Sequence, residues 1–286
     1  MRLLPVALLG VLLSVTSAPG PAHAAGGEML ESSGPSSTLD LTWSLYVGGV
    51  SMGTAAMTAR LEGDSYRANA RLETLGVVNR FWQSKIETAS HGRILPDRVQ
   101  PAVYDSFATR RSGRRQEVTL RFDADGPASL TANPSYDEDR YPVSPEHKRH
   151  ALDPLSSVLF LTTSYRANEQ KPCGVVAPVF DGRRRYDIAF SFLRRANVKM
   201  DNGLYSGPAL VCEVEYRQVA GYQQRIVERG MKMPKIFAWV AAVPSTSDPS
   251  RRYMIPVRLW AETDFGLITA VASQIRIDGA ELRKPS

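Results

Sequence analysis

The chain has 286 residues, with 35 Lys plus Arg against 29 Asp plus Glu and a formal net charge of +6. Arg and Glu are interspersed along most segments, whereas a nucleic-acid-binding protein concentrates its positive charge on one element. We therefore expect no nucleic-acid partner, and the small excess leaves only a weak attraction to anionic envelope surfaces. The length fits one large β domain or two smaller ones.

Residues 1–24 have the pattern of an export signal. Arg2 supplies the positive charge, Leu3 to Val15 form a short apolar run, and Ala22-His23-Ala24 is a small-x-small cleavage site. We predict cleavage after Ala24 and a periplasmic protein, with a secreted one as the close variant. No Cys lies at the cleavage point for lipid attachment, and no later stretch reaches the roughly 20 apolar residues of a spanning helix. We expect no stable membrane anchor.

The segment after the signal, residues 25–37, is rich in Gly, Ser and Pro and predicts a flexible lead-in to a single β-rich domain over residues 38–279. Leu39 to Val47 then alternate apolar and polar residues, which is the period of a half-buried strand, and Gly48-Gly49 turns the chain. Similar patterns follow to the end of the domain. The further predicted strands are 50–61, 66–72, 85–90, 98–109, 117–123, 175–180, 185–193, 210–219, 223–229, 236–243, 253–263 and 266–277.

One helix is predicted among these strands. Asp153-Pro154 has the residues of a helix N-cap and first helical position, apolar residues follow at helical spacing from Leu155 to Thr162, and the pattern ends near Arg166-Ala167. Residues 133–150 before it predict a long surface connection. The fold class that results is mainly β: one large curled antiparallel sheet or open β-barrel, with a single central helix packed on its concave side.

The two cysteines, Cys173 and Cys212, predict a disulfide. An even number of thiols in an oxidising compartment normally pairs, and neither Cys-x-x-Cys spacing nor a neighbouring His supports a metal or redox site. Cys212 shares the face of Leu210, Val214 and Tyr216, so the bridge is expected to point into the core.

No catalytic pattern stands out. The sequence lacks a nucleophile elbow, a phosphate-binding glycine loop and calcium-loop spacing. His147 and His150 have the spacing of two metal ligands without an identifiable third, and they favour solvated side chains beside basic neighbours. We therefore assign no catalytic residue, no metal and no cofactor, and expect that the protein is not an enzyme.

Two features predict contact with a ligand, each beside a structural alternative. The turn carrying Arg183, Arg184, Arg185 and Tyr186 offers guanidinium groups suited to phosphate or carboxylate, although such turns are often only solvated. Phe81 and Trp82 end a short apolar connection and form a candidate groove lip, or else pack against the helix. The tryptophans within strands, Trp43, Trp239 and Trp260, are expected in the core.

The chain resembles the bacterial envelope family known as domain of unknown function 3108, from about Leu39 to Ile277. The motifs that carry the likeness are Tyr46-Val47-Gly48-Gly49, Gly53-Thr54-Ala55, Leu152 to Ser156, Val179 to Asp187, Tyr205 to Cys212 and Ile255 to Arg258. The resemblance implies an exported, mostly β protein without established catalytic residues. At the level of architecture alone, the chain is also similar to open-barrel lipoprotein carriers of the envelope.

Together these features favour a noncatalytic periplasmic envelope protein that binds a lipid or acylated molecule, including an acylated protein, in an apolar groove. The physical reason is that a curled, unclosed sheet leaves a concavity. The first alternative is an envelope interaction or scaffold protein with a filled core, which docks a partner through a sheet edge or the arginine-rich turn. The second is an enzyme of unrecognised type.

Overall fold

The computed structural model describes residues 36–75, 84–110, 113–137, 141–163, 173–223, 234–248, 251–264 and 266–282. The predicted signal peptide, the cleavage site after Ala24 and the candidate lip residues Phe81 and Trp82 lie outside these ranges, and so does most of the predicted strand 223–229. Those predictions remain untested.

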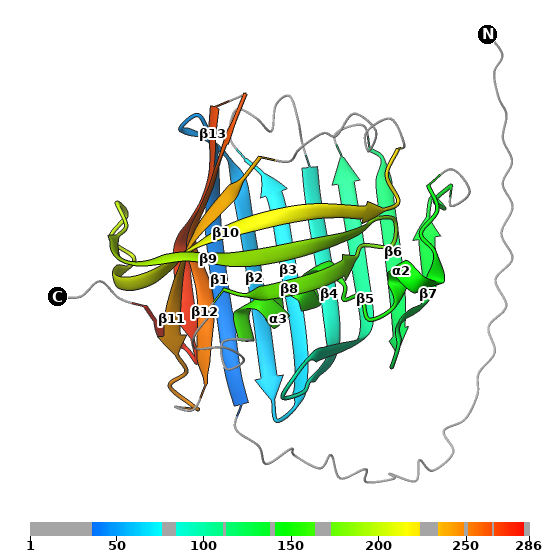
Figure 1. Ribbon diagram of the computed structural model, residues 1–286, viewed down its shortest axis with the longest axis horizontal. Helices are drawn as coiled ribbons and strands as arrows, with labels where there is room; N and C mark the ends of the chain where they lie inside the picture. The colour runs from blue at the N-terminus through cyan, green and yellow to red at the C-terminus, as the bar shows by residue number, and fades with distance from the viewer. Residues whose placement is uncertain are drawn as a thin grey trace, which may run out of the picture. The chain divides into compact units, whose positions relative to one another are not determined.

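Strands dominate the described residues (Figure 1). The strands of the first half are β1 (Ser36–Val47), β2 (Val50–Glu62), β3 (Ser65–Thr74), β4 (Ser84–Ile94), β5 (Val99–Arg110), β6 (Arg115–Asp123) and β7 (Gly126–Asn133). Two helices follow, α2 (Pro145–Lys148) and α3 (Pro154–Thr163). The strands of the second half are β8 (Val175–Phe180), β9 (Arg185–Lys199), β10 (Ser206–Ala220), β11 (Ile236–Pro244), β12 (Arg252–Thr263), β13 (Gly266–Ile277) and β14 (Ala280–Glu281).

All these strands belong to one 14-stranded sheet in the order β7-β6-β5-β4-β3-β2-β1-β13-β12-β11-β10-β9-β8, with β14 beside β13. Neighbouring strands run antiparallel. Because β1 pairs with both β2 and β13, it joins the meander of β1 to β7 to the meander of β8 to β13 within one sheet. The sheet curls until β8, β9 and β10 cross in front of the first meander (Figure 1). The predicted fold class, one curled antiparallel sheet with a helix on its concave side, is confirmed.

The alternation read from the sequence explains the main core. Leu39, Leu41 and Trp43 of β1 are buried on one face, and this face continues through Met57 and Ala59 of β2. Helix α3 packs against it with Leu155 and Leu159 and contacts β3, β4, β5, β8 and β12. The helix therefore fills much of the space between the two halves of the sheet.

A second core lies around the disulfide. Cys173 and Cys212 are bonded, with their Cα atoms 6.3 Å apart, and both are buried with Leu210, Val214 and Met254. The predicted bridge and its orientation toward the core are confirmed. Val211, expected on the opposite face, is also buried, so β10 is covered on both faces at this position.

Several boundaries differ from the sequence prediction. Strand β1 begins at Ser36, so the end of the predicted lead-in is already strand, and Ser37 is buried. Residues 126–133, predicted as part of no strand, form β7 along β6. This strand is difficult to predict because it begins with Gly126 and Pro127, two residue types that disfavour strands. The sheet also continues past residue 279 into β14, and the connection before α3 holds the single-turn helix α2.

Candidate functional site

A buried polar network holds the start of α3. One carboxylate oxygen of Asp153, Oδ1, accepts the backbone N–H groups of Leu155 and Ser156, both at 2.9 Å, which confirms the predicted N-cap. The other oxygen accepts the hydroxyl of Ser90 at 3.0 Å and that of Ser156. The hydroxyl of Tyr66 lies 2.6 Å from Ser156 Oγ. The network thus ties the helix to β3 and β4.

The electrostatics of this network follow from its burial. Asp153 is fully buried, and burial raises the pKa of its carboxyl above the usual range, although hydrogen bonds from Ser156, Ser90 and Leu155 partly oppose the shift. Burial and the nearby Asp153 also raise the pKa of Tyr66. None of these side chains lines a cavity described below. The network therefore fixes the start of α3 against the sheet.

An apolar cavity of about 220 Å³ lies between α3 and the sheet, the location at which the sequence predicts a groove. Phe160 of α3 and Leu152 before it form one wall. The opposite wall comes from the start of β5 and the β6–β7 turn. The apolar lining residues are Val99, Pro101, Phe122, Ala124, Ala151, Leu152, Phe160 and Pro178.

The rim of this cavity is polar and sterically fixed. Asp97, Arg98 and Asp123 line it from two turns, and His150 closes it from the α2–α3 connection with a positive φ of 56°. The His150 backbone N–H donates to Asp125 O at 2.6 Å. Gly126 has φ 131°, and a Cβ there would lie 2.7 Å from Lys148 O, so the approach of these two turns requires glycine. An apolar chamber with a charged rim suits an amphiphilic ligand.

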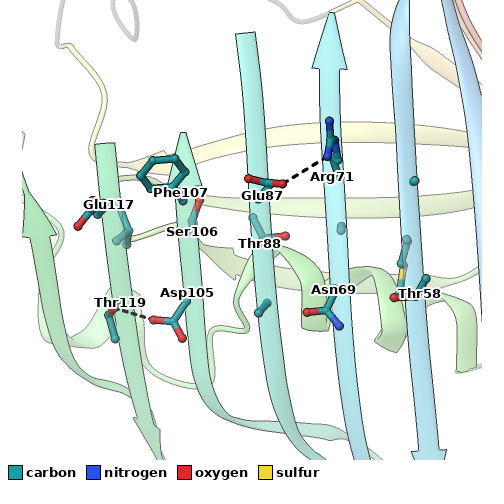
Figure 2. Close-up of a pocket in the computed structure, with 15 residues that line it drawn as sticks. Thr58, Asn69, Arg71, Glu87, Thr88, Asp105, Ser106, Phe107, Glu117 and Thr119 are labelled. Atoms are coloured by element: carbon teal, nitrogen blue, oxygen red, sulfur yellow. Dashed lines mark hydrogen bonds and ion pairs between the residues drawn. The ribbon is translucent and has the colours of Figure 1, made fainter. Parts of the chain in front are cut away.

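A larger hollow, about 570 Å³, lies on the other face of the sheet (Figure 2). Its side chains come from positions of β2 to β6 that alternate with core residues, and α3 lies behind the sheet in this view. One row consists of Thr58, Asn69, Ala89, Asp105 and Thr119, in register across five strands. The adjacent row consists of Ala56, Arg71, Glu87, Phe107 and Glu117. This outer trough was not predicted.

Much of the charge in the outer trough is internally matched. Arg71 pairs with Glu73 at 2.5 Å and approaches Glu87 at 3.6 Å, and Thr119 Oγ1 donates to Asp105 Oδ1 at 2.7 Å. Hydrogen bonding by Lys85 lowers the pKa of Glu87, which keeps it ionised. The signal that could have revealed the trough is the occurrence of small outward residues, Ala56 and Ala89, between longer polar ones.

The arginine-rich turn is held by its own aspartate. Oδ1 of Asp181 accepts the backbone N–H groups of Arg183 at 2.9 Å and of Arg184 at 2.6 Å. The guanidinium of Arg185 is engaged internally: it lies 2.6 Å from Asp187 Oδ1 and donates to His147 O at 2.9 Å. The guanidinium of Arg185 thus already has acceptors within the protein.

The other members of this turn meet tyrosines. The Arg183 guanidinium lies 5.8 Å from the ring centroid of Tyr136, and that of Arg184 lies 5.6 Å from Tyr222. Tyr186 stacks on Tyr216 with centroids 4.6 Å apart, and burial raises its pKa. Arg183, Arg184, Arg185 and Tyr186 are thus brought to one place, and their contact with an anionic ligand stays a prediction.

The strand tryptophans divide into two environments. Trp43 is buried in the main core, and its Nε1 donates to Pro256 O at 2.7 Å. Trp239 and Trp260, on β11 and β12, are only partly buried, and both lie beside Arg258. The expectation of a core position was correct for Trp43 and holds in part for Trp239, which packs against the main core; Trp260 lies outside both core clusters.

Two further kinds of binding feature are missing from the described ranges. No three His, Cys, Asp or Glu side chains there lie close enough together to hold a metal ion. Within them no helix has both the length and the apolar character needed to cross a bilayer.

Among the described residues, one curled β-sheet wraps around α3, and this architecture defines the class of protein. The chain belongs to the family described as "Protein of unknown function (DUF3108)", whose model matches residues 40–273. The resemblance noted from the sequence motifs is thereby confirmed.

Among solved structures, the chain is similar to a β-barrel-like protein of domain of unknown function DUF1849 from Brucella abortus. The identity is 9% and the TM-score 0.47, over 85% of this chain and 97% of that one. No curated protein matches the sequence.

Proposed function

We propose that this protein is a noncatalytic periplasmic envelope protein that binds the apolar part of a lipid or acylated molecule in the cavity beside Phe160. The observation that carries the proposal is the apolar lining of a cavity between helix and sheet. An apolar ligand there would remove both its own surface and that of the cavity from water. The export signal read from residues 1–24 supports the location.

The size of the cavity limits the ligand. At roughly 30 Å³ for a group of water size, 220 Å³ holds about seven such groups, which corresponds to part of an acyl chain. Whole ligands occupy pockets of about 300–1,000 Å³, so the remainder of the molecule would lie outside the cavity. The polar rim formed by Asp97, Arg98, Asp123 and His150 is the surface it would meet.

The proposal is tested with protein exported by cells and purified gently. Native mass spectrometry is expected to show a bound lipid, and a fluorescent fatty acid is expected to bind the delipidated protein. Amino-terminal sequencing of the periplasmic fraction should begin at Ala25. A protein that carries no lipid and ignores the fatty acid would refute the proposal.

A pair of matched variants locates the ligand. Ala124 is exposed and lines the cavity, so Ala124→Trp is expected to fill it and weaken fatty-acid binding at least tenfold. Ala128 is exposed on the adjacent strand β7 and lies outside the lining, so Ala128→Trp is the control. Equal affinities of the two variants would place the fatty acid elsewhere.

The outer trough favours a second candidate function, an interaction or scaffold protein of the envelope. Its volume of about 570 Å³ exceeds that of the cavity beside Phe160, and its open face suits a partner better than an enclosed chain. Crosslinking in cells through a photoreactive residue at position 107 would capture such a partner. Capture at position 107 together with lipid-free protein would favour this function over lipid binding.

A further inference from the structure

The side chain of Arg258 lies between two tryptophans on neighbouring strands. Trp239 of β11 is opposite Arg258 of β12, and Phe237 is opposite Trp260 one same-face pair further along. The Arg258 guanidinium carbon lies 5.2 Å from the ring centroid of Trp239 and 5.8 Å from that of Trp260. We call Phe237, Trp239, Arg258 and Trp260 the Arg258 cluster.

The rings of this cluster support one another. Trp239 and Trp260 meet edge to face with centroids 5.7 Å apart, and Phe237 stacks on Trp260 at 5.7 Å. Aromatic faces attract a cation but supply no lone pair for its N–H groups. The aromatic contacts therefore hold the guanidinium without supplying an acceptor for its N–H groups.

One of these donors is buried without an acceptor. Among the described residues, Nε of Arg258 has no hydrogen-bond partner, and none of the ion pairs in this part of the chain includes Arg258. Arg185 shows the contrasting case, because Asp187 and two backbone carbonyls accept from its guanidinium. A buried charged donor without an acceptor is unfavourable, and an oxyanion would relieve it.

The charge around the cluster is not neutralised locally. The carboxylate in the same row as Phe237 is Glu213, and Lys235 pairs with it at 3.1 Å. Glu262, one same-face pair beyond Trp260, is exposed. A ligand that approaches Arg258 thus meets one uncompensated positive charge framed by aromatic rings.

An apolar surface continues from the cluster along the same face. Thr269 lies opposite Trp260, and the next pair on that face joins Glu262 to Leu267, whose side chain is 40% exposed. On the other side of β13, Tyr46 lies opposite Thr269. Aromatic rings, Leu267 and one unpaired guanidinium form a surface for a molecule that has both an acidic group and an apolar body.

We propose that the Arg258 cluster binds the phosphate or carboxylate group of an acidic amphiphile, with Arg258 as the oxyanion contact and Trp239 and Trp260 as its aromatic walls. This site is separate from the cavity beside Phe160, because no residue of the cluster lines that cavity. The planar fork of Arg258 suits bidentate recognition of either oxyanion.

The tryptophans of the cluster provide the measurement. The tryptophan fluorescence of the exported, delipidated chain would be followed during titration with dodecyl phosphate, dodecanoate and neutral dodecyl glucoside, each as monomer. We expect a saturable change with the anionic amphiphiles at least tenfold tighter than with the glucoside. The better of the two anions identifies the headgroup, and inorganic phosphate tests whether the anion alone suffices.

Substitutions at Arg258 test the assigned contact. Arg258→Met is expected to weaken binding of the better anion at least tenfold, and Arg258→Lys to recover part of the loss because it keeps the charge without the fork. Arg252→Met, at the exposed start of the same strand, is the control and should bind normally. If Arg258→Met does not fold, an anion-specific rise in the melting temperature of the wild-type chain replaces it.

The outcomes separate this site from the proposed lipid cavity. Ala124→Phe, which narrows the cavity beside Phe160 without adding a tryptophan, should leave the fluorescence response unchanged, so loss of fatty-acid binding at the cavity does not affect this test. Equal affinity for neutral and anionic amphiphiles, or unchanged anion binding by Arg258→Met, would overturn the proposal. A wild-type chain whose fluorescence and melting temperature ignore every anion would do the same.

Discussion

Asp153 and Arg258 are both charged groups brought into contact with the sheet, and they differ in how completely the protein satisfies them. Asp153 is fully buried, and both of its oxygens accept hydrogen bonds from the helix and from β4. Arg258 is partly buried between indoles, and its Nε has no acceptor among the described residues. A completed network indicates a structural role, whereas an incomplete one indicates where an external group can bind.

The largest expected effect comes from removing the satisfied group. Asp153→Ala would leave two N–H groups of α3 and the hydroxyls of Ser90 and Ser156 without their acceptor. Loss of a cap and of buried hydrogen bonds should lower the free energy of unfolding by about 3 kcal/mol. Urea denaturation measures this value. A loss below about 1 kcal/mol would contradict the structural role of Asp153.

A smaller, pH-dependent effect separates the charge of Asp153 from its shape. Because its pKa is raised in the folded state, its contribution to stability is full below the unfolded value near 4 and is lost as pH rises through the folded pKa. Asp153→Asn cannot titrate. The stability advantage of wild type over Asp153→Asn should therefore grow as the pH falls from 7 to 4, as followed by denaturation at each pH.

Asp278 can be compared with Asp153, because its carboxylate also accepts several hydrogen bonds but lies nearer the surface. Burial alone would raise its pKa, but hydrogen bonds from Ser245, Ser37, Ser247 and Thr38 outweigh burial and hold the pKa well below its usual range. Its stabilisation is present above about pH 4 and is lost as pH falls toward the folded pKa.

The matching experiment is Asp278→Asn, which tolerates the positive φ of 52° at this position. We expect a loss of about 1 kcal/mol at pH 7 that shrinks as the pH falls below 4, the opposite direction from Asp153. Acid titration of both variants by circular dichroism compares them. The same slope for both carboxylates would show that hydrogen bonding does not distinguish them.

The smallest effect is expected at Arg258. Arg258→Met removes a favourable cation–π contact and also removes a buried Nε that has no acceptor. Because these two effects offset each other, the free energy of unfolding should change by only about 0.5 kcal/mol. Arg252→Met gives the baseline for an exposed arginine. A loss of about 2 kcal/mol or more at Arg258 would assign it a structural role like that of Asp153.

The sequence predicted the role of Asp153 better than that of Arg258. Asp153-Pro154 is a local signal, so the helix start could be located from neighbouring residues alone. The partners Ser90 and Tyr66 could not, because strand alternation shows which face a residue occupies but not which residue lies opposite it on a distant strand. The helix, the disulfide and the curled sheet follow from local patterns, and the buried network follows from register.

The Arg258 cluster could not be predicted from the sequence for a related reason. Trp239 and Trp260 have the pattern of core residues, and only the register shift between Trp239 and Val240 brings Arg258 opposite Trp239. The outer trough likewise requires five strands in close alignment. Arginines at the turn 183–185 were visible in the sequence, yet the pairing of Arg185 with Asp187 became clear only from the folded side chains.

The pairing of β1 with β13 also determines when the chain can finish folding. Leu39 lies opposite Ile277, so the central pair of the sheet joins the two ends of the domain. If the chain emerges from its amino-terminal end, β1 to β7 can associate through neighbouring hairpins, but the edge of β1 that pairs with β13 stays open until almost all of the polypeptide is available. Until β13 pairs with β1, the long edge of β1 is exposed to other chains. A partner or chaperone that covers this edge would protect the folding chain from aggregation.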